Sequence, residues 1–110
     1  MLLIEDDEDL RRLFAYYLQQ LSLDIQQADS WEAVQSNFQN QKFDTILTDR
    51  HLGDGIADEQ LPMLRLMAPK ILVMTGNPDT QQVESLYQLG FDQVLAKPLN
   101  QSQIEQALLS

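Results

Sequence analysis

Five side chains that could bind or transfer charged groups stand at four separate places in the chain. Glu5 and Asp6 follow one short apolar run, Asp49 follows another, and Thr75 and Lys97 each follow a further run. Three carboxylates gathered in one crevice repel one another unless they bind protons or surround a cation. Carboxylate oxygens are ligands that suit Mg²⁺ or Mn²⁺. These residue types therefore indicate a divalent metal site, provided that the fold brings them together.

The same residues are suited to phosphoryl transfer. Mg²⁺ usually takes only one or two carboxylates and keeps several waters, which leaves a carboxylate, a hydroxyl and an ammonium for other work. A lysine and a metal ion supply the positioning and charge neutralisation on which phosphoryl transfer depends. A carboxylate can be the nucleophile and become an acyl phosphate. Each residue alone also has a structural explanation, and it is their joint placement that indicates chemistry.

Short apolar runs and helical patterns alternate along the chain. We predict strands at residues 2–4, 45–47, 71–74 and 94–96, and a weaker one at residues 23–25 that continues into Gln26 and Gln27. Apolar residues spaced i, i+3, i+4, i+7, i+8 and i+11 predict a helix over residues 10–21, with carboxylates at its start. We expect four further helices: one capped by Ser30, one near residues 61–68, one from Asp79 to Gly90, and one after Asn100.

Strand and helix alternate five times, which is typical of an α/β fold with a parallel sheet covered by helices on both faces. The first, third and fourth runs are continuously apolar, as central parallel strands are, whereas the second and fifth are more polar and are expected at the edges. With right-handed crossovers, this predicts a single doubly wound five-stranded parallel sheet in the order 2-1-3-4-5. Ligands bind such sheets beyond the carboxyl ends of the strands, where all five candidate residues would lie.

Composition excludes several classes of protein. The 110 residues carry 7 Lys and Arg against 17 Asp and Glu, a net charge of −10, and contain no cysteine. We therefore expect no disulfide, no direct nucleic-acid partner and no binding to an anionic membrane surface. No apolar run is long enough to insert into a membrane, and no basic segment of a secretion signal precedes the first apolar run. A cytoplasmic protein is expected.

Four segments carry a family resemblance: LLIEDD followed by LRRLF, then TILTDRHLGDG, ILVMTGN and QVLAKPL. Together they resemble the receiver domains of response regulators in bacterial two-component signalling, over essentially all of residues 1–110. The resemblance implies a flavodoxin-like fold. It also implies a domain that accepts a phosphoryl group from a phosphohistidine, on a sensor histidine kinase or a histidine phosphotransfer protein, and shifts between inactive and active conformations.

The resemblance also implies roles for the metal-site residues. Asp49 matches the family's phosphoacceptor, and Glu5 and Asp6 match its acidic pair. Asp6 would bind Mg²⁺ directly, whereas Glu5 would act mainly through water. His51 would offer its backbone carbonyl to the metal, so that its imidazole is incidental.

Thr75 and Lys97 match the two residues that contact the phosphoryl group in the family. Thr75 would hydrogen-bond a phosphoryl oxygen in the active state, and Lys97 would pair with the phosphate. Pro98 matches the family's Lys-Pro step, where the peptide bond is often cis. Such a domain is not a metabolic enzyme, although it catalyses its own phosphorylation and dephosphorylation. No output module is visible, so the chain is either a stand-alone receiver or a piece of a longer protein, for example a hybrid sensor kinase.

Four positions depart from the family pattern. Gly53 stands where proline is common and Ala57 where glycine is common, so the loop after Asp49 is expected to be differently shaped or looser. Val94 replaces the usual Tyr or Phe, which puts the readout of phosphorylation in doubt. Arg50 is an unusual bulky cation that either holds acidic neighbours or points to solvent.

Three alternative functions stay open at this stage. The chain could be a receiver-like binding module with altered or lost phosphorylation switching. A phosphatase of the haloacid-dehalogenase type would need a second aspartate where His51 stands. A flavodoxin-type flavin binder would need a phosphate-binding loop after the first strand, where the acids from Glu5 to Asp9 would repel a phosphate.

Overall fold

The computed structural model describes residues 1–109, so Ser110, the last residue of the predicted domain, lies outside the described residues. In chain order the elements are β1 (Leu2–Ile4), α1 (Glu8–Gln20), β2 (Gln26–Ala28), α2 (Trp31–Phe38), β3 (Thr45–Asp49), β4 (His51–Leu52), β5 (Gly55–Ile56), α3 (Ala57–Met67), β6 (Lys70–Gly76), α4 (Thr80–Leu89), β7 (Gln93–Lys97) and α5 (Gln101–Leu109). The five predicted strand–helix repeats are present. The short antiparallel hairpin β4–β5 is an addition that the sequence patterns did not predict.

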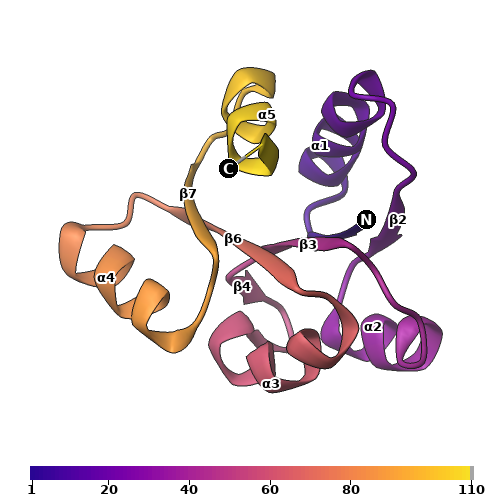
Figure 1. The fold of residues 1–110 in the computed structure, drawn as a ribbon, viewed down its shortest axis with the longest axis horizontal. Coiled ribbons are helices and arrows are strands. Elements are labelled where there is room, and N and C mark those ends of the chain that lie inside the picture. The colour runs from indigo at the N-terminus through magenta and orange to yellow at the C-terminus, as the bar shows by residue number, and fades with distance from the viewer. Residues whose placement is uncertain (110) are drawn as a thin grey trace.

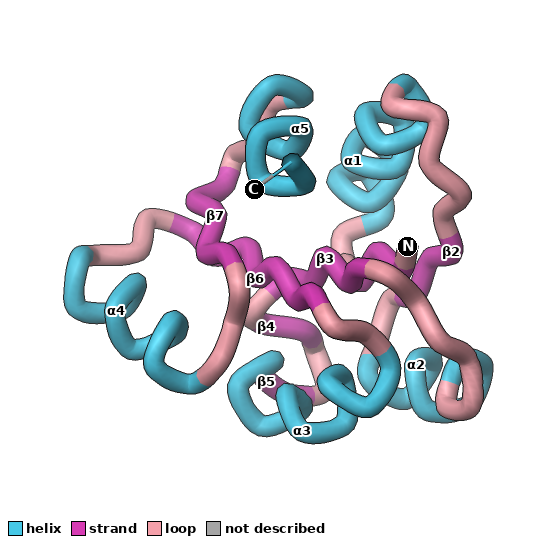
Figure 2. Tube along the Cα trace, viewed as in Figure 1, coloured by secondary structure: helices cyan, strands magenta, loops and turns pink. Residues whose placement is uncertain are grey.

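Five parallel strands form one sheet in the order β2-β1-β3-β6-β7. This confirms the predicted order 2-1-3-4-5, with the two more polar strands at the edges. Figure 1 shows α1 and α5 on one face of the sheet and α2, α3 and α4 on the other, and Figure 2 gives the same arrangement as a tube. The helices therefore bury both faces of the central strands, as a doubly wound fold requires.

Alternate side chains of each central strand enter different cores. Leu3, Leu47 and Leu72 pack in the core beneath α1 and α5. Their neighbours Ile46 and Ile71 pack in the opposite core, beneath α2 and α3. A strand that is buried on both faces needs apolar residues at every position, because successive side chains point to opposite sides. This requirement explains the continuous apolar runs of β1, β3 and β6.

The second strand begins three residues later than predicted, at Gln26 rather than at residue 23. In the sheet, Gln26 pairs with Leu2 and Ala28 pairs with Ile4. Gln26 and Gln27 are exposed. The position of this edge strand is therefore set by backbone pairing with β1 and not by burial of apolar side chains. The observed strand therefore contains the predicted Gln26 and Gln27, whereas the apolar run at residues 23–25 precedes it.

Helix ends follow the residues that the sequence marks for them. Asp7, Ser30 and Asp79 each accept a hydrogen bond from a backbone N–H in the first turn of α1, α2 and α4, at 3.0, 3.0 and 2.7 Å. Gly90 ends α4 with a φ of +120°, a conformation that glycine adopts without strain. These caps fix where the loops at the carboxyl edge of the sheet begin.

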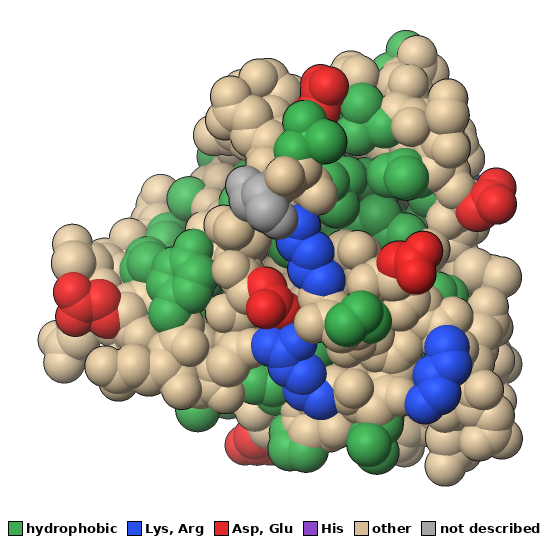
Figure 3. Space-filling model, viewed as in Figure 1, with side chains coloured by type: hydrophobic (Ala, Val, Ile, Leu, Met, Phe, Trp, Pro, Cys, Tyr) green, Lys and Arg blue, Asp and Glu red, His purple; other side chains and the backbone are tan. Residues whose placement is uncertain are grey.

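The surface has an apolar hollow near α1 and α5. Figure 3 shows apolar side chains gathered between α1 and α5, where Leu21, Leu23, Leu108 and Leu109 help to line a hollow. None of the helices in the described part of the chain combines the length and the apolarity that a membrane span requires.

Candidate functional site

The carboxyl ends of four strands meet at one edge of the sheet. Glu5 directly follows β1, and Asp49 ends β3 opposite Met74 of β6. Thr75 is the next residue of β6 and pairs with Ala96, and Lys97 is opposite Gly76. The parallel register therefore brings together residues that are more than ninety positions apart in the chain, as the sequence analysis predicted.

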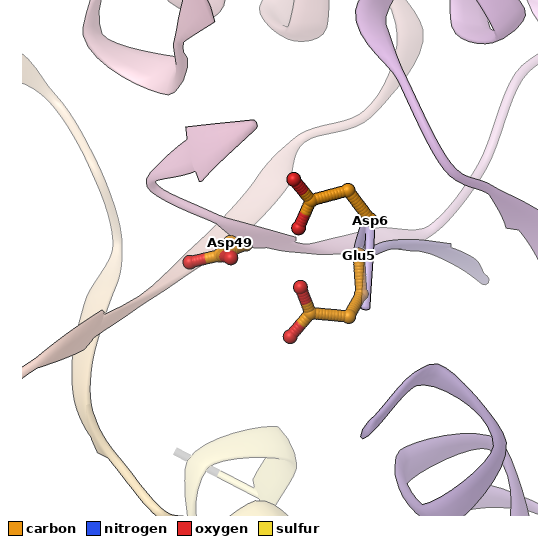
Figure 4. Close-up of side chains that lie close together, drawn as sticks. All are labelled: Glu5, Asp6 and Asp49. Atoms are coloured by element: carbon orange, nitrogen blue, oxygen red, sulfur yellow. The ribbon is translucent and has the colours of Figure 1, made fainter. Parts of the chain in front are cut away.

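Glu5, Asp6 and Asp49 form a cluster in which one carboxylate oxygen of each residue lies within 4.8 Å of the others. Figure 4 shows the carboxylates of Glu5 and Asp6, from the end of β1, pointing toward Asp49 on β3. Glu5 is completely buried, Asp49 is 8% exposed, and Asp6 is open to solvent. The donor atoms are all carboxylate oxygens, and one side of the cluster can be reached from solvent. This chemistry fits a hard divalent cation.

Lys97 connects two of these carboxylates. Its ammonium nitrogen lies 2.6 Å from Oε1 of Glu5 and 3.0 Å from Oδ2 of Asp49. The other carboxylate oxygen of Glu5 accepts a longer hydrogen bond of 3.5 Å from the backbone N–H of Asp7. The position of Lys97 beside Asp49 was predicted, whereas its pairing with Glu5 was not. That contact spans the two strands, β3 and β6, that separate β1 from β7, and no local pattern encodes it.

Burial and crowding shift the charge states of this cluster. Burial, together with the neighbouring Asp49, raises the pKa of Glu5 from 4.5 to about 7, although Lys97 acts in the opposite direction. Burial alone would lower the pKa of Lys97, but its contacts with Glu5 and Asp49 outweigh burial and raise it. The cluster therefore has a permanently charged ammonium beside a carboxylate, Glu5, that changes protonation near neutral pH.

The other two predicted site residues lie close by. Thr75 is 4% exposed and stands one residue beyond Met74, the partner of Asp49 in the sheet register. His51 lies in β4, two residues after Asp49, and its side chain is exposed and outside the acidic cluster. The peptide bond from Lys97 to Pro98 is cis.

Arg50 settles one of the alternatives that the sequence left open. Its guanidinium donates from Nε and Nη2 to the two carboxylate oxygens of Asp58, at 3.0 and 2.9 Å. Both side chains are largely buried. Arg50 therefore holds an acidic neighbour on α3 and does not point to solvent. The pairing partner was missed in the sequence, because eight residues separate the pair and they lie in different elements.

Two further contacts of this region were also missed. Asp54, in the turn of the β4–β5 hairpin, accepts hydrogen bonds from the backbone N–H groups of Trp31 and Glu32 at the start of α2. Tyr87 of α4 uses its hydroxyl oxygen to accept a 3.3 Å hydrogen bond from the backbone N–H of Val94. Both contacts join elements that are separate in sequence, and no spacing rule could have indicated them.

Comparison with known proteins points to one family. The family model described as the response regulator receiver domain matches residues 1–109. Among curated proteins, the chain is 30% identical to the transcription factor SKN7 of Chaetomium thermophilum over 98% of this chain. It is 26% identical to the alginate biosynthesis transcriptional regulatory protein AlgB of Pseudomonas putida over 97% of this chain. The chain spans only 15% of the length of the first relative and 24% of the second.

Solved structures agree with this result. A response regulator of Burkholderia pseudomallei, solved with a phosphorylated aspartic acid, calcium ion and citrate, superimposes with a TM-score of 0.85 at 29% identity, covering 97% of this chain and 64% of that one. The chemotaxis response regulator CheY4 of Vibrio cholerae gives a TM-score of 0.83 at 18% identity, covering 98% of this chain and 93% of that one, and shows the fold alone.

The raised pKa of Glu5 predicts how the stability of the metal-free protein depends on pH. Because the folded state binds the Glu5 proton more tightly than the unfolded chain, this group's stabilising contribution is complete below pH 4.5 and is lost as pH rises through about 7. Urea unfolding in EDTA, from about pH 5 to about pH 8, should show this loss. In Glu5→Gln the loss should be absent, whereas the control Glu84→Gln, an exposed glutamate on α4, should behave as the wild type. Parallel pH curves for the wild type and Glu5→Gln would contradict the assignment.

Proposed function

The chain belongs to the response regulator receiver domain family of two-component signalling, whose members are phosphoacceptors, and we propose that Asp49 is the residue that is phosphorylated. Asp49 is the carboxylate at the end of a central strand that contacts Lys97 directly, at 3.0 Å. Glu5 is fully buried and already paired at 2.6 Å, so an incoming phosphoryl group cannot reach it as readily. The contact between Asp49 and Lys97 is the observation that carries the proposal.

The proposed reaction is a transfer between two side chains. A carboxylate oxygen of Asp49 attacks the phosphorus of a phosphohistidine, and a new O–P bond forms as the P–N bond breaks. The donor imidazole leaves with the electron pair of that bond and takes up a proton. Lys97, already beside the attacking carboxylate, offsets the negative charge that the phosphoryl group brings. Thr75, buried at the next position of β6, would donate its hydroxyl to a phosphoryl oxygen in the active state.

We propose Mg²⁺ as the metal, held by Asp6 and Asp49 with the backbone carbonyl of His51, while Glu5 acts through water. The clustered oxygen donors support a divalent cation, because three carboxylates against one ammonium leave negative charge uncompensated. The similar Burkholderia pseudomallei protein carries a calcium ion with its phosphorylated aspartic acid. A bound divalent cation supplies positive charge to the oxygens of the transferred group.

The partner that this function requires is a phosphohistidine donor. We propose that it is a sensor histidine kinase or a histidine phosphotransfer protein in the cytoplasm, and that residues 1–110 are one receiver domain. The curated relatives are transcription regulators several times longer than this chain. Phosphorylation would shift an existing equilibrium between inactive and active conformations, which a separate output domain or protein would read.

Phosphorylation itself provides the first test. Incubation with acetyl phosphate and Mg²⁺ should add one phosphoryl group to the wild type, detected by intact mass and Phos-tag gels. Asp49→Asn should lose the labelling, because an amide is not a nucleophile of this kind. Asp44→Asn is the matched control, since Asp44 is an exposed aspartate just before the same strand, and it should be labelled as the wild type is. Unchanged labelling of Asp49→Asn would show that the acceptor lies elsewhere, and no labelling of the wild type would favour a binding module.

Metal binding provides a second test. A cation that binds the folded site alone stabilises the protein by about 1.4 kcal/mol at ten times its Kd. For a domain of this size, that corresponds to a rise in Tm of about 6 °C. Calorimetry with and without Mg²⁺ should show the rise in the wild type and in Asp44→Asn, and a much smaller one in Asp6→Asn. An equal Mg²⁺ effect in Asp6→Asn would remove Asp6 from the metal site.

A further inference from the structure

The loop that follows Asp49 is attached to two helices, α2 and α3, by contacts that the family resemblance does not predict. We call residues 50–56 the acceptor loop; it begins beside Asp49, contains the β4–β5 hairpin and ends at α3. At its base, Arg50 accepts a 2.7 Å hydrogen bond from the N–H of Ala57 through its carbonyl oxygen, and its side chain pairs with Asp58. These contacts attach the base of the loop to α3.

The turn of the loop is attached to a different helix. Asp54 Oδ1 accepts from the backbone N–H of Trp31 at 3.1 Å, and Oδ2 accepts from the N–H of Glu32 at 3.0 Å. The next N–H of α2, that of Ala33, is bound by the hydroxyl of Ser30. Three N–H groups at the start of α2 are therefore satisfied, one by a local cap and two by a carboxylate that lies 22 and 23 residues further along the chain.

The hydrogen bonds to Asp54 are favourable to its charged form. Burial raises the pKa of Asp54, but the backbone N–H groups of Trp31 and Glu32 outweigh burial and bring it below its ordinary value. A carboxylate at the start of a helix also interacts favourably with the helix dipole. The attachment therefore persists at neutral pH.

Gly55 also lies close to the side chain of Trp31, where the turn of the acceptor loop meets the start of α2. Gly55 has a φ of +142°, and a Cβ at this position would meet Cδ1 of the Trp31 indole at 3.4 Å. Trp31 is 3% exposed, and its indole nitrogen has no hydrogen-bond partner in the described part of the chain. By contrast, a Cβ at Gly53 would meet nothing within 4 Å. The turn of the loop is thus fixed through Asp54 and Gly55, while Gly53 beside them lies open.

We propose that Asp54 is a positioning residue, which ties the acceptor loop to α2 and so holds the backbone of His51 where the divalent cation binds. This inference rests on the proposed function, because it takes the cation site from it. His51 pairs with Ile56 in the hairpin, and Leu52 pairs with Gly55, so the strand that carries the His51 carbonyl is connected through one pair to the residue next to Asp54. Without the hydrogen bonds between Asp54 and the start of α2, the β4–β5 hairpin would lose its polar attachment to that helix.

The test compares two variants that each remove a cap from the same helix. Asp54→Ala detaches the acceptor loop, whereas Ser30→Ala removes the local cap and leaves the loop attached. Both should lower Tm to a similar extent. Mg²⁺ affinity, measured by ¹H–¹⁵N NMR titration without a phosphodonor, should fall roughly tenfold in Asp54→Ala, the low end for loss of an outer partner of a metal site. In Ser30→Ala it should stay within about twofold of the wild type.

Two further readouts separate positioning from general destabilisation. Labelling of Asp54→Ala should be slow at low Mg²⁺ and should recover at saturating Mg²⁺, since the reacting groups are intact. Asp54→Asn keeps one carbonyl oxygen as acceptor and should lie between the alanine variant and the wild type. Trp31, the single tryptophan of the chain, should emit at longer wavelength in Asp54→Ala, because Gly55 no longer covers its indole.

The outcomes distinguish this inference from the proposed function. An unchanged Mg²⁺ affinity in Asp54→Ala, or an equal loss in Ser30→Ala, overturns the positioning role while labelling of the wild type still supports Asp49 as acceptor. If the wild type binds Mg²⁺ but is never labelled, the acceptor role fails, and a selective loss of affinity in Asp54→Ala supports the positioning role. A wild type that binds no Mg²⁺ overturns both.

Discussion

The ammonium of Lys97, between the carboxylates of Glu5 and Asp49, is the interaction on which the site depends. Buried carboxylates that lie close together repel each other, and a positive group beside them reduces that repulsion. Lys97 provides this group at 2.6 and 3.0 Å, from the far end of the chain. The sheet order places β7 on the β6 side of β3, and from there its last residue reaches Glu5 across Asp49. The excess negative charge that remains is what gives a divalent cation a place there.

The departures from the family pattern near Asp49 have a physical explanation in the loop that follows it. Ala57 stands where glycine is common, but it is the first residue of α3 and needs no positive φ. Gly55 has a positive φ, and a side chain there would press on Trp31. The contacts of Arg50 with Asp58 and of Asp54 with α2 hold the loop as a hairpin at its base and at its turn. These contacts leave the loop anchored rather than loose, and a shape different from that of the family stays a prediction.

At β7, Val94 and Tyr87 form a contact between the strand and α4. Val94 occupies the position where the family usually has an aromatic ring, and it lies half-buried against the core beneath α3 and α4. An aromatic residue nevertheless contacts this point of the strand, because the hydroxyl of Tyr87 accepts a hydrogen bond from the Val94 N–H and lies 3.4 Å from the side-chain oxygen of Gln93. The ring is provided by α4 and reaches the backbone of β7. The contact between this helix and the strand is therefore polar and depends on the spacing of the two elements.

The sequence by itself determined the fold class, the strand order and the identity of the clustered acids, because these depend on short-range patterns: continuous apolar runs, helical spacing, caps, and polar residues directly after strands. It misplaced the start of β2, because backbone pairing and not composition decides there: the exposed glutamines pair with β1, while the apolar run before them does not. Only the tertiary structure could decide that Lys97 binds Glu5, that Arg50 binds Asp58 and that Asp54 binds α2. Each of these contacts joins elements whose distance is set by the packing of the whole sheet and its helices. The sequence around a charged side chain does not indicate which distant residue it will contact.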